Sequence, residues 1–238
     1  MREELDGVDL PGSIRVVDLR TAPERDAIPT RSCIVLSGVG KVAAASAIAF
    51  AAGASDLRCV LNFGYCAALT EKHQVGSILI PTTFAQHDFG GISPSVTWLA
   101  RPGERTLQYQ AMSDHRDLVF SANIKLAQIV KSSLSNVASI SYGGLLLSGD
   151  KFVASTAARE SIRAGISLDA IALDMEASAV AQTCSRFGIP FACVKIVSDD
   201  AADESARTYL RSIDSFRGAR RAIISALLAI SEGGSEWK

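Results

Sequence analysis

Short apolar runs rich in β-branched residues alternate along the chain with longer segments of helical periodicity. The apolar runs predict strands at residues 13–19, 32–37, 58–64, 76–82, 138–149, 170–175 and 191–199. The segments of helical periodicity predict helices at residues 41–53, 121–133, 154–165, 176–187 and 215–231. Strands that alternate with helices favour a largely parallel sheet with helices on both faces. The pattern therefore predicts an α/β fold.

Residues 84–118 interrupt this alternation. They are polar, carry two prolines and three glycines, and show weak periodicity, so they predict a long loop or excursion. Loops of this length inside a compact domain are usually functional or disordered. No linker-like segment divides the chain, so residues 1–238 are expected to form a single domain with a frayed C-terminal tail.

Composition narrows the classes of partner. Of the 238 residues, 48% are hydrophobic and 21% are charged, which is ample for a sizeable core. A net charge of −1 gives no electrostatic footprint for nucleic acid or an anionic membrane surface. A small-molecule ligand or a protein partner is therefore expected, with no nucleic acid and no membrane.

Cysteine usage and the N-terminus indicate a location. The five cysteines lack CxxC spacing and most lie inside apolar runs, which is typical of reduced, buried thiols in a cytosolic protein. The three histidines are too scattered to suggest a metal cluster. The first ten residues are acidic without a signal-peptide core, and the apolar run 42–54 is too short to span a bilayer. A soluble, cytoplasmic protein is expected.

Polar or glycine-rich stretches follow several of the predicted strands, at the position where open α/β sheets bind their ligands. The stretch SGVGK, residues 37–41, opens a helix and could present backbone N–H groups to an anion or a ribose. It lacks the upstream glycine and the following Ser/Thr of a Walker motif. A tight strand-to-helix turn explains it equally well.

Three further strand ends carry side chains suited to chemistry. They are Asn62–Ala68 (NFGYCAA, a second small-residue turn), Ser148–Val153 (SGDKFV) and Asp174–Glu176 (DME). The run 191–199 ends in Ser198 and Asp199. The structural explanations are solvated loop acids, a helix-start glutamate favoured by the helix dipole, and a core phenylalanine. The functional explanations are carboxylates that face a base and a sugar diol, and an aromatic ring that stacks on the base.

In order along the chain, SGVGKVAAA, NFGYCAAL, VGSILIP, HD, SGDKFV, LDMEASAVAQ and VKIVSDDAADES resemble the nucleoside phosphorylase and nucleosidase superfamily. Within it, the sequence is most similar to 5′-methylthioadenosine/S-adenosylhomocysteine nucleosidases, over roughly residues 32–230. The resemblance implies a three-layer α/β/α fold around a twisted mixed sheet. It also implies a homodimer that uses no metal and no organic cofactor.

The resemblance implies roles for individual residues. Asp199 corresponds to the acid that protonates or hydrogen-bonds the purine N7, as N-glycoside cleavage requires, and Ser198 orients it. Glu176 corresponds to the carboxylate that binds the ribose hydroxyls, and Met175 lies against the sugar.

The remaining implied contacts concern the base and the 5′ substituent. Phe152 stacks on the base, and the backbone of Val153 reads the Watson–Crick edge of adenine. Val39 and Tyr209 fall where the family builds an apolar pocket for the 5′-thio group.

Three departures from the family pattern stand out. Tyr65 replaces a serine that touches water or phosphate, and Lys195 stands where many members have an arginine with a bidentate fork. Residues Met1–Leu5 resemble the motif that follows the family's first strand, but that strand is absent. If the match is real, Glu4 is the base that activates the attacking water; a charged helix start is an equally good explanation.

The leading hypothesis is hydrolysis of the N-glycosidic bond of 5′-methylthioadenosine and/or S-adenosylhomocysteine, with release of adenine. Three alternatives remain: a phosphorylase of purine nucleosides or uridine, a futalosine-type nucleosidase, and a non-catalytic nucleoside-binding protein. Phosphorolysis requires several fixed cations around phosphate, and Lys195 is the only obvious one near the expected nucleophile.

Overall fold

The computed structural model describes residues 8–9, 15–19, 32–92, 97–99, 119–135, 140–165 and 169–232. Its centre is an eight-stranded sheet in the order β10-β5-β13-β4-β12-β11-β6-β9. The strands are β4 (Val60–Ala68), β5 (Ile78–Ile80), β6 (Thr83–Gln86), β9 (Val119–Ser121), β10 (Ile140–Tyr142), β11 (Leu145–Ser148), β12 (Ala170–Asp174) and β13 (Phe191–Asp199). The sheet is mixed, because β12 pairs antiparallel with β4, as do β13 with β5 and β6 with β9.

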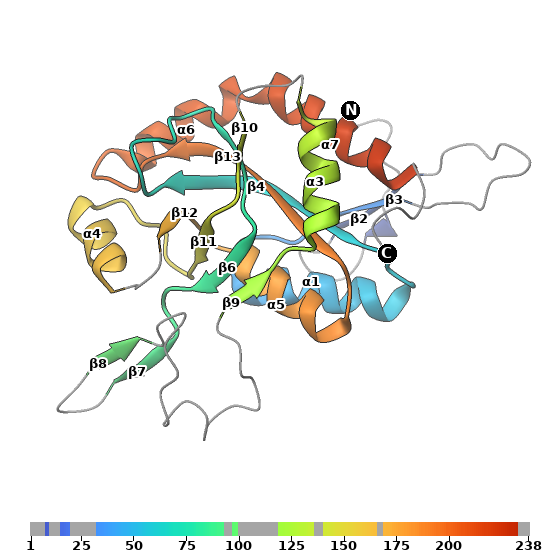
Figure 1. The fold of residues 1–238 in the computed structure, drawn as a ribbon, viewed down its shortest axis with the longest axis horizontal. Coiled ribbons are helices and arrows are strands. Elements are labelled where there is room, and N and C mark those ends of the chain that lie inside the picture. The colour runs from blue at the N-terminus through green and yellow to red at the C-terminus, as the bar shows by residue number, and fades with distance from the viewer. Residues whose placement is uncertain are drawn as a thin grey trace, which may run out of the picture.

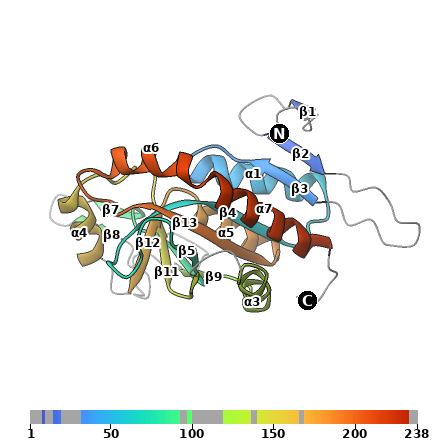
Figure 2. The same ribbon diagram turned by 90° about the horizontal axis from the view of Figure 1, so that it is seen from above.

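Helices cover the sheet on both sides, which confirms the expected three-layer α/β/α arrangement (Figures 1 and 2). The helices are α1 (Lys41–Ala54), α3 (Ile124–Ser133), α4 (Thr156–Ala164), α5 (Ala177–Phe187), α6 (Ser205–Ser215) and α7 (Arg217–Glu232). The pair α1 and α5 pack together on one side, while α6 and α7 run along the opposite side (Figure 1). In the described part of the chain, no helix is long and apolar enough to cross a membrane.

Two smaller sheets accompany the central one. The strands β1 (Val8–Asp9), β2 (Arg15–Leu19) and β3 (Ser32–Leu36) form an antiparallel sheet, and β7 (Gly90–Ile92) pairs with β8 (Thr97–Leu99). The prediction of a loop from residue 84 is therefore wrong for β6, β7 and β8. The rest of that excursion, residues 93–96 and 100–118, lies outside the described residues, as does the tail 233–238.

The strand β13 forms the middle of the core, and all nine of its residues are buried. It pairs with β4 along almost its whole length, in parallel. A strand covered on both faces reads as a continuous apolar run, which explains why FACVKIV was recognisable in the sequence. The same burial places the polar end of β13 inside the protein rather than in a solvated loop.

Two predicted elements have different bounds in the structure, and one helix was not predicted. The run 138–149 is two strands, because Gly143 and Gly144 adopt positive φ angles of 95° and 89° and redirect the chain from one edge of the sheet towards the other. The stretch NFGYCAA continues β4 instead of forming a turn. Helix α6 was not predicted, because its apolar positions are few and its start follows a run of acidic residues.

Candidate active site

The candidate residues gather at the last residues of three strands of the central sheet, beside the first turn of α1. Ser148 ends β11, Asp174 ends β12 and Asp199 ends β13. Ser148 lies opposite Asp174 in the parallel pair of β11 and β12. The turn before α1 reaches the same place, since the N–H of Gly40 donates to Oε1 of Glu176 at 2.9 Å.

The Asp199 carboxylate is 2% exposed and held at both oxygens. The N–H of Ala201 donates to Oδ1 at 3.0 Å, and the hydroxyl of Ser198 lies 2.9 Å from Oδ2. The same hydroxyl lies 3.1 Å from the carbonyl oxygen of Cys66. A hydroxyl has one hydrogen, so when Ser198 donates it to the carbonyl oxygen of Cys66, the Ser198 oxygen is free to accept a hydrogen bond from the protonated carboxyl of Asp199.

The surroundings of Asp199 favour its neutral form more than water favours the neutral form of an exposed aspartate. Burial raises the pKa of Asp199 above its ordinary value and the nearby charge of Asp200 adds to the rise, although the hydrogen bonds from Ala201 and Ser198 oppose it. A carboxyl group with a raised pKa can donate a proton near neutral pH. Ser198 therefore lies where the sequence expected an orienting residue.

Glu176 lies between β12 and α5, as the helix-start position predicted. Burial raises the pKa of Glu176, while the Lys195 ammonium and the N–H of Gly40 favour its ionised form. Met175, partly buried, precedes it in the same turn. This turn therefore presents a carboxylate and a thioether beside the Asp199 strand.

Aromatic side chains form a row beside the two carboxylates. Phe152 is 48% exposed and meets Tyr209 edge-on, with ring centroids 5.7 Å apart. Tyr209 meets Tyr65 edge-on at 6.1 Å, and Tyr65 leans on Phe216 at 6.3 Å. Burial raises the pKa of Tyr209, and the charges of Glu176 and Asp199 add to it, so its phenol shares their surroundings. The exposed face of Phe152 suits stacking on a base better than core packing.

The other predicted contacts differ in how far the structure describes them. Val39 is 74% exposed in the turn before α1, and Val153 packs against a small apolar cluster that includes Leu69 and Leu147. The Tyr65 hydroxyl is buried and, within the part of the chain that the structure describes, has no hydrogen-bond partner. Glu4 lies outside the described residues.

Lys195 is placed differently from a ligand-binding cation. Its side chain is 2% exposed, and its Nζ lies 2.8 Å from Oδ2 of Asp174. Burial disfavours the charged ammonium, but Asp174, Cys193 and Glu176 together outweigh the cost of burial and raise the pKa of Lys195. The positive charge expected to face a ligand is thus already paired inside the protein.

Lys41 is a second cation beside the site, and its role was not recognised in the sequence. Its Nζ lies 2.5 Å from Oδ1 of Asp88, 3.1 Å from Oε1 of Gln86 and 3.6 Å from Oδ2 of Asp150. The N–H of Lys41 donates to Oδ1 of Asp150 at 2.8 Å. The sequence allowed SGVGK either to present N–H groups to an anion or a ribose or to form a tight turn, and in the structure the N–H groups of residues 40 and 41 bind carboxylates of the protein itself. The HD dipeptide that supplies Asp88 was the available signal.

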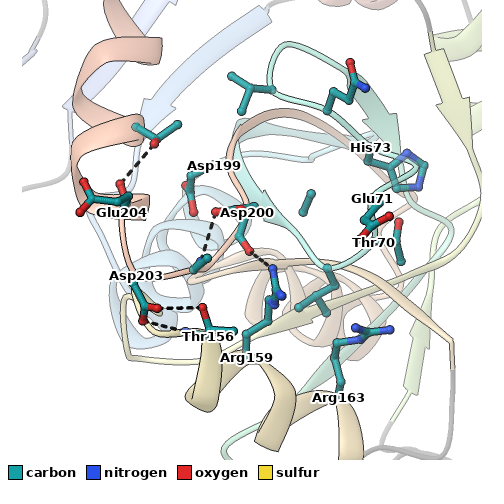
Figure 3. Close-up of a pocket in the computed structure, with 16 residues that line it drawn as sticks. Thr70, Glu71, His73, Thr156, Arg159, Arg163, Asp199, Asp200, Asp203 and Glu204 are labelled. Carbon is teal, nitrogen blue, oxygen red and sulfur yellow. Dashed lines mark hydrogen bonds between the residues drawn. The ribbon is translucent and has the colours of Figure 1, made fainter.

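A cavity of about 1000 Å³ is lined in part by Asp199 (Figure 3). Its wall contains Thr70, Glu71 and His73 from the segment after β4, facing Arg159 and Arg163 of α4 (Figure 3). None of Glu176, Phe152 or Met175 lines it. Asp199 is therefore shared between this cavity and the candidate site.

Helix α4 also holds the loop that follows Asp199. Oδ1 and Oδ2 of Asp203 accept hydrogen bonds from the N–H and hydroxyl of Thr156 at 3.1 and 3.0 Å (Figure 3). Nη1 of Arg159 donates to the carbonyl oxygen of Asp200 at 3.1 Å. Between them, Ala201 adopts a φ of 56°, uncommon for a residue with a side chain. The conformation that directs its N–H to Asp199 is thus fixed from α4.

The arrangement suits acid-assisted cleavage of a bond to a leaving group that must be protonated. It combines a buried carboxyl of raised pKa, a second carboxylate and an exposed aromatic ring. Among the residues that the structure describes, no group of three or more His, Cys, Asp or Glu side chains could hold a metal ion.

Known proteins are similar to this chain in sequence and in fold. The family model of the phosphorylase superfamily matches residues 30–230. A 5′-methylthioadenosine/S-adenosylhomocysteine nucleosidase of Staphylococcus carnosus is 30% identical over 176 residues, which are 74% of this chain and 72% of the relative. The nucleosidase of the same name from Staphylococcus aureus is 29% identical over 196 residues, 82% of this chain and 80% of the relative.

Solved structures agree on the fold. The nucleosidase of the same name from Neisseria meningitidis, in complex with methylthio-immucillin-A, superimposes with a TM-score of 0.75 at 24% identity, covering 95% of this chain and 91% of that one. The futalosine hydrolase of Helicobacter pylori gives a TM-score of 0.77 at 18% identity, covering 95% and 88%. With a family model over most of its length and these relatives beside it, the chain belongs to the phosphorylase superfamily.

Proposed function

We propose that this protein hydrolyses the N-glycosidic bond of 5′-methylthioadenosine and/or S-adenosylhomocysteine and releases adenine. The observation that carries the proposal is the buried Asp199 carboxyl, whose raised pKa suits a proton donor and which lies at the end of β13 beside Glu176. The choice of nucleoside rests on the names of the relatives, since the chain is 30% identical to one such nucleosidase.

In the proposed mechanism, the proton of Asp199 moves to N7 of the purine as the C1′–N9 bond breaks. The bonding electrons leave with adenine, which departs neutral, while C1′ gains oxocarbenium character. A water molecule then adds to C1′ and loses a proton to a general base. Glu176 accepts hydrogen bonds from the ribose hydroxyls, and these charge-assisted bonds hold the sugar in place.

The other contacts follow the same scheme. Phe152 stacks on the purine, the Val153 backbone meets its Watson–Crick edge, and Met175 lies against the sugar. Val39 and Tyr209 surround the 5′-thio group. The buried Tyr65 hydroxyl, which lacks a partner among the described residues, suits a hydrogen bond to the attacking water or to substrate.

The general base is Glu4 in this proposal, on the strength of the sequence resemblance alone. Glu4→Gln should reduce turnover about 100-fold or more, the scale of general-base catalysis. The neighbouring Glu3→Gln is the matched control. Full activity in Glu4→Gln would remove Glu4 from the mechanism.

The pairing of two lysines supports hydrolysis over phosphorolysis. A phosphate beside C1′ needs cations or a nest of backbone donors to offset its desolvation. Lys195 is paired with Asp174, Lys41 is paired with Asp88, and the N–H groups of Gly40 and Lys41 bind carboxylates. Each of these groups is already engaged by an acidic side chain.

The deciding experiment measures adenine release from 5′-methylthioadenosine in phosphate-free buffer and in buffer with added phosphate. Equal rates and free 5-methylthioribose are expected. A rate that depends on phosphate, or a sugar 1-phosphate among the products, would instead establish a phosphorylase. Binding without release of any base would establish a nucleoside-binding protein.

Futalosine hydrolysis is the second candidate, because a futalosine hydrolase shares the fold at a TM-score of 0.77. It would use the same carboxylates on a different 5′ substituent. A panel that compares kcat/KM for 5′-methylthioadenosine, S-adenosylhomocysteine and futalosine separates the two. A preference for futalosine would replace the leading substrate.

We also infer a homodimer located in the cytoplasm. Helix α1 (KVAAASAIAFAAGA) is apolar on all sides, and its Val42 and Phe50 side chains are 77% and 44% exposed, which supports burial against a second copy. The free thiols of Cys66, Cys184 and Cys193 are buried, as expected for a cytoplasmic protein. Light scattering of the wild type and of Val42→Asp tests the dimer, which the charged variant should dissociate.

A further inference from the structure

The strongest feature left unexplained is the ion pair between Lys195 and Asp174. Both side chains are almost fully buried, with exposed fractions of 2% and 1%, and Nζ lies 2.8 Å from Oδ2. Burying two charges costs desolvation free energy that their attraction offsets only partly, so such a pair is weak evidence for stability. A role in the adjacent site is the better explanation.

The side chain of Lys195 crosses a whole strand to reach its partner. Lys195 is on β13, Asp174 ends β12, and β4 lies between them in the sheet. The residue of β4 opposite Lys195 is Gly64. A Cβ placed on Gly64 would lie 3.1 Å from Nζ, so the absence of a side chain there leaves room for the ammonium.

Asp174 connects Lys195 to the first turn of helix α5 through hydrogen bonds. Its carboxylate accepts the N–H of Ala177 at 2.9 Å (Oδ2) and the hydroxyl of Ser148 at 2.5 Å (Oδ1). Ser148 Oγ in turn accepts the N–H of Ser178 at 2.8 Å. Two N–H groups of the first turn of α5 are therefore satisfied through Asp174 and Ser148.

The turn closed by these bonds carries Glu176. It begins at Asp174 and ends at Ala177, and the Glu176 carboxylate leaves it to meet the N–H of Gly40. A shift of Asp174 would move this carboxylate as a unit with its turn. The position of Glu176 thus depends on a lysine two strands away.

We propose that Lys195 is a positioning residue for sugar recognition. Through Asp174 it fixes the turn that carries Glu176, and its charge favours the ionised carboxylate that accepts from the sugar hydroxyls. This inference rests on the proposed function, in which Glu176 binds the ribose. Lys195 acts through Asp174 and does not need to touch the substrate.

The charged and titratable groups around Glu176 allow a pH test. They are Lys195 and Cys193 on β13, Asp174 on β12 and Tyr209 on α6. Burial raises the pKa of Glu176, Lys195 opposes this rise, and Asp174 adds to it with a smaller effect. Loss of Lys195 should therefore raise the pKa of Glu176 further. The acidic limb of kcat/KM, where Glu176 becomes protonated, should move to higher pH.

The experiment compares wild type and Lys195→Met on 5′-methylthioadenosine and its 2′-deoxy analogue. We expect KM for the ribonucleoside to rise about 10-fold or more, the loss of one charge-assisted hydrogen bond, with a much smaller change for the deoxy analogue. The acidic limb of the ribonucleoside profile should shift upward. Ile196→Val, a buried neighbour on β13, is the matched control, and it should lower both activities equally and leave the limb in place.

Lys195→Met leaves the buried Asp174 carboxylate unpaired and could prevent folding. A second variant is therefore needed that removes both charges. Lys195→Met with Asp174→Asn removes both charges and keeps an oxygen for Ala177 and Ser148. The charge of Lys195 lowers the Glu176 pKa more than the charge of Asp174 raises it. The acidic limb of the double variant should therefore shift to higher pH, by less than in Lys195→Met alone. Equal losses on both nucleosides, or an unchanged limb in a folded variant, would overturn the proposal.

Equilibrium binding of the same two nucleosides separates this inference from the proposed function. If wild type releases no adenine, the hydrolase proposal fails, yet calorimetric titration still compares ribonucleoside and deoxynucleoside affinity in each variant. A ribose preference that falls about 10-fold in Lys195→Met supports the positioning role. A preference that is unchanged, or absent from wild type, rejects it.

Discussion

The backbone N–H of Gly40 donates a 2.9 Å hydrogen bond to Oε1 of Glu176, across 136 residues of sequence. The bond joins the turn before α1 to the turn before α5, so two helix starts share one carboxylate. Gly40 reaches it with a φ of 96°, a conformation that side chains rarely adopt. A Cβ there would also lie 3.2 Å from Oδ1 of Asp150, which binds the next N–H.

Replacement of Gly40 should therefore weaken sugar binding. In Gly40→Ala the strained backbone should cost about 1–3 kcal/mol of folding free energy. Alanine keeps the backbone N–H, but a backbone that moves to relieve the positive φ should carry this N–H away from Glu176 and raise KM for ribonucleosides about 10-fold. Gly53→Ala in α1 is the control, since nothing lies within 4 Å of its Cβ and helical alanine should stabilise the protein. An unchanged KM in Gly40→Ala would show that this bond does not position Glu176.

Asp199→Asn should abolish most of the catalysis and keep the fold. Asparagine accepts hydrogen bonds at the same place but cannot protonate the leaving base, so kcat should fall about 100-fold or more. Asp214→Asn in α6 is the control, because this side chain is 84% exposed and forms an ion pair with Arg217 on the surface. Steady-state adenine release measures both. Near-normal turnover in Asp199→Asn would remove it from the mechanism.

The plot of kcat/KM against pH should be bell-shaped, with Glu176 responsible for the acidic limb and Asp199 for the alkaline limb. In the proposed mechanism activity needs ionised Glu176, so kcat/KM should fall as pH drops through the Glu176 pKa. It needs protonated Asp199, so kcat/KM should also fall as pH rises through the Asp199 pKa. Burial raises both pKa values, which places the acidic limb above the usual range of a glutamate. Loss of the alkaline limb in Asp199→Asn, with the acidic limb retained, is the expected signature.

Asp199→Asn should also be more thermostable than wild type near neutral pH. A carboxyl whose pKa is raised by folding contributes stability below its unfolded pKa and loses it as pH rises through the folded value. The amide does not ionise, so the gain in Tm over wild type should shrink as pH falls below the Asp199 pKa. Thermal melts across this range measure it. A Tm difference that is constant with pH would mean that Asp199 titrates normally.

Phe152→Ala should weaken binding of the base. Stacking on an aromatic ring contributes about 1–3 kcal/mol per base, so KM should rise roughly 5- to 150-fold. Phe187→Ala at the end of α5 is the control, because that ring is 55% exposed and outside the candidate site. Titration with free adenine isolates the effect from the sugar. Equal adenine affinity in wild type and Phe152→Ala would contradict stacking.

The sequence singled out Asp199, Glu176 and Phe152 as candidates, because each lies at or just after the end of a strand whose apolar run is visible on its own, and the family resemblance supplied their expected roles. The structure brings these side chains together although β12 runs antiparallel to β4 and β13 runs parallel to it, so a parallel-sheet pattern alone does not account for their meeting. The extension of β4 through NFGYCAA was not predictable in the same way. Its small residues resemble a turn, and only pairing with β13 keeps them extended.

The pairing of Lys195 with Asp174 could not be read from the sequence. It depends on the order β13-β4-β12 and on the register that puts Gly64 opposite Lys195. Neither follows from the periodicity of any single segment. The sequence did not reveal the partners of Lys41 either, because Asp88 and Asp150 come from separate segments that only the fold brings together.

The left-handed conformation of Ala201 restricts how this enzyme could acquire new substrates. A β-branched residue at 201 would be strongly disfavoured at a φ of 56°. A one-residue insertion or deletion between Asp199 and Asp203 would separate the N–H of Ala201 from Asp199, or Asp203 from Thr156. The loop after Asp199 is therefore constrained in its length and in the residue at position 201. Evolution of a different specificity must proceed through less constrained positions, such as the exposed Val39.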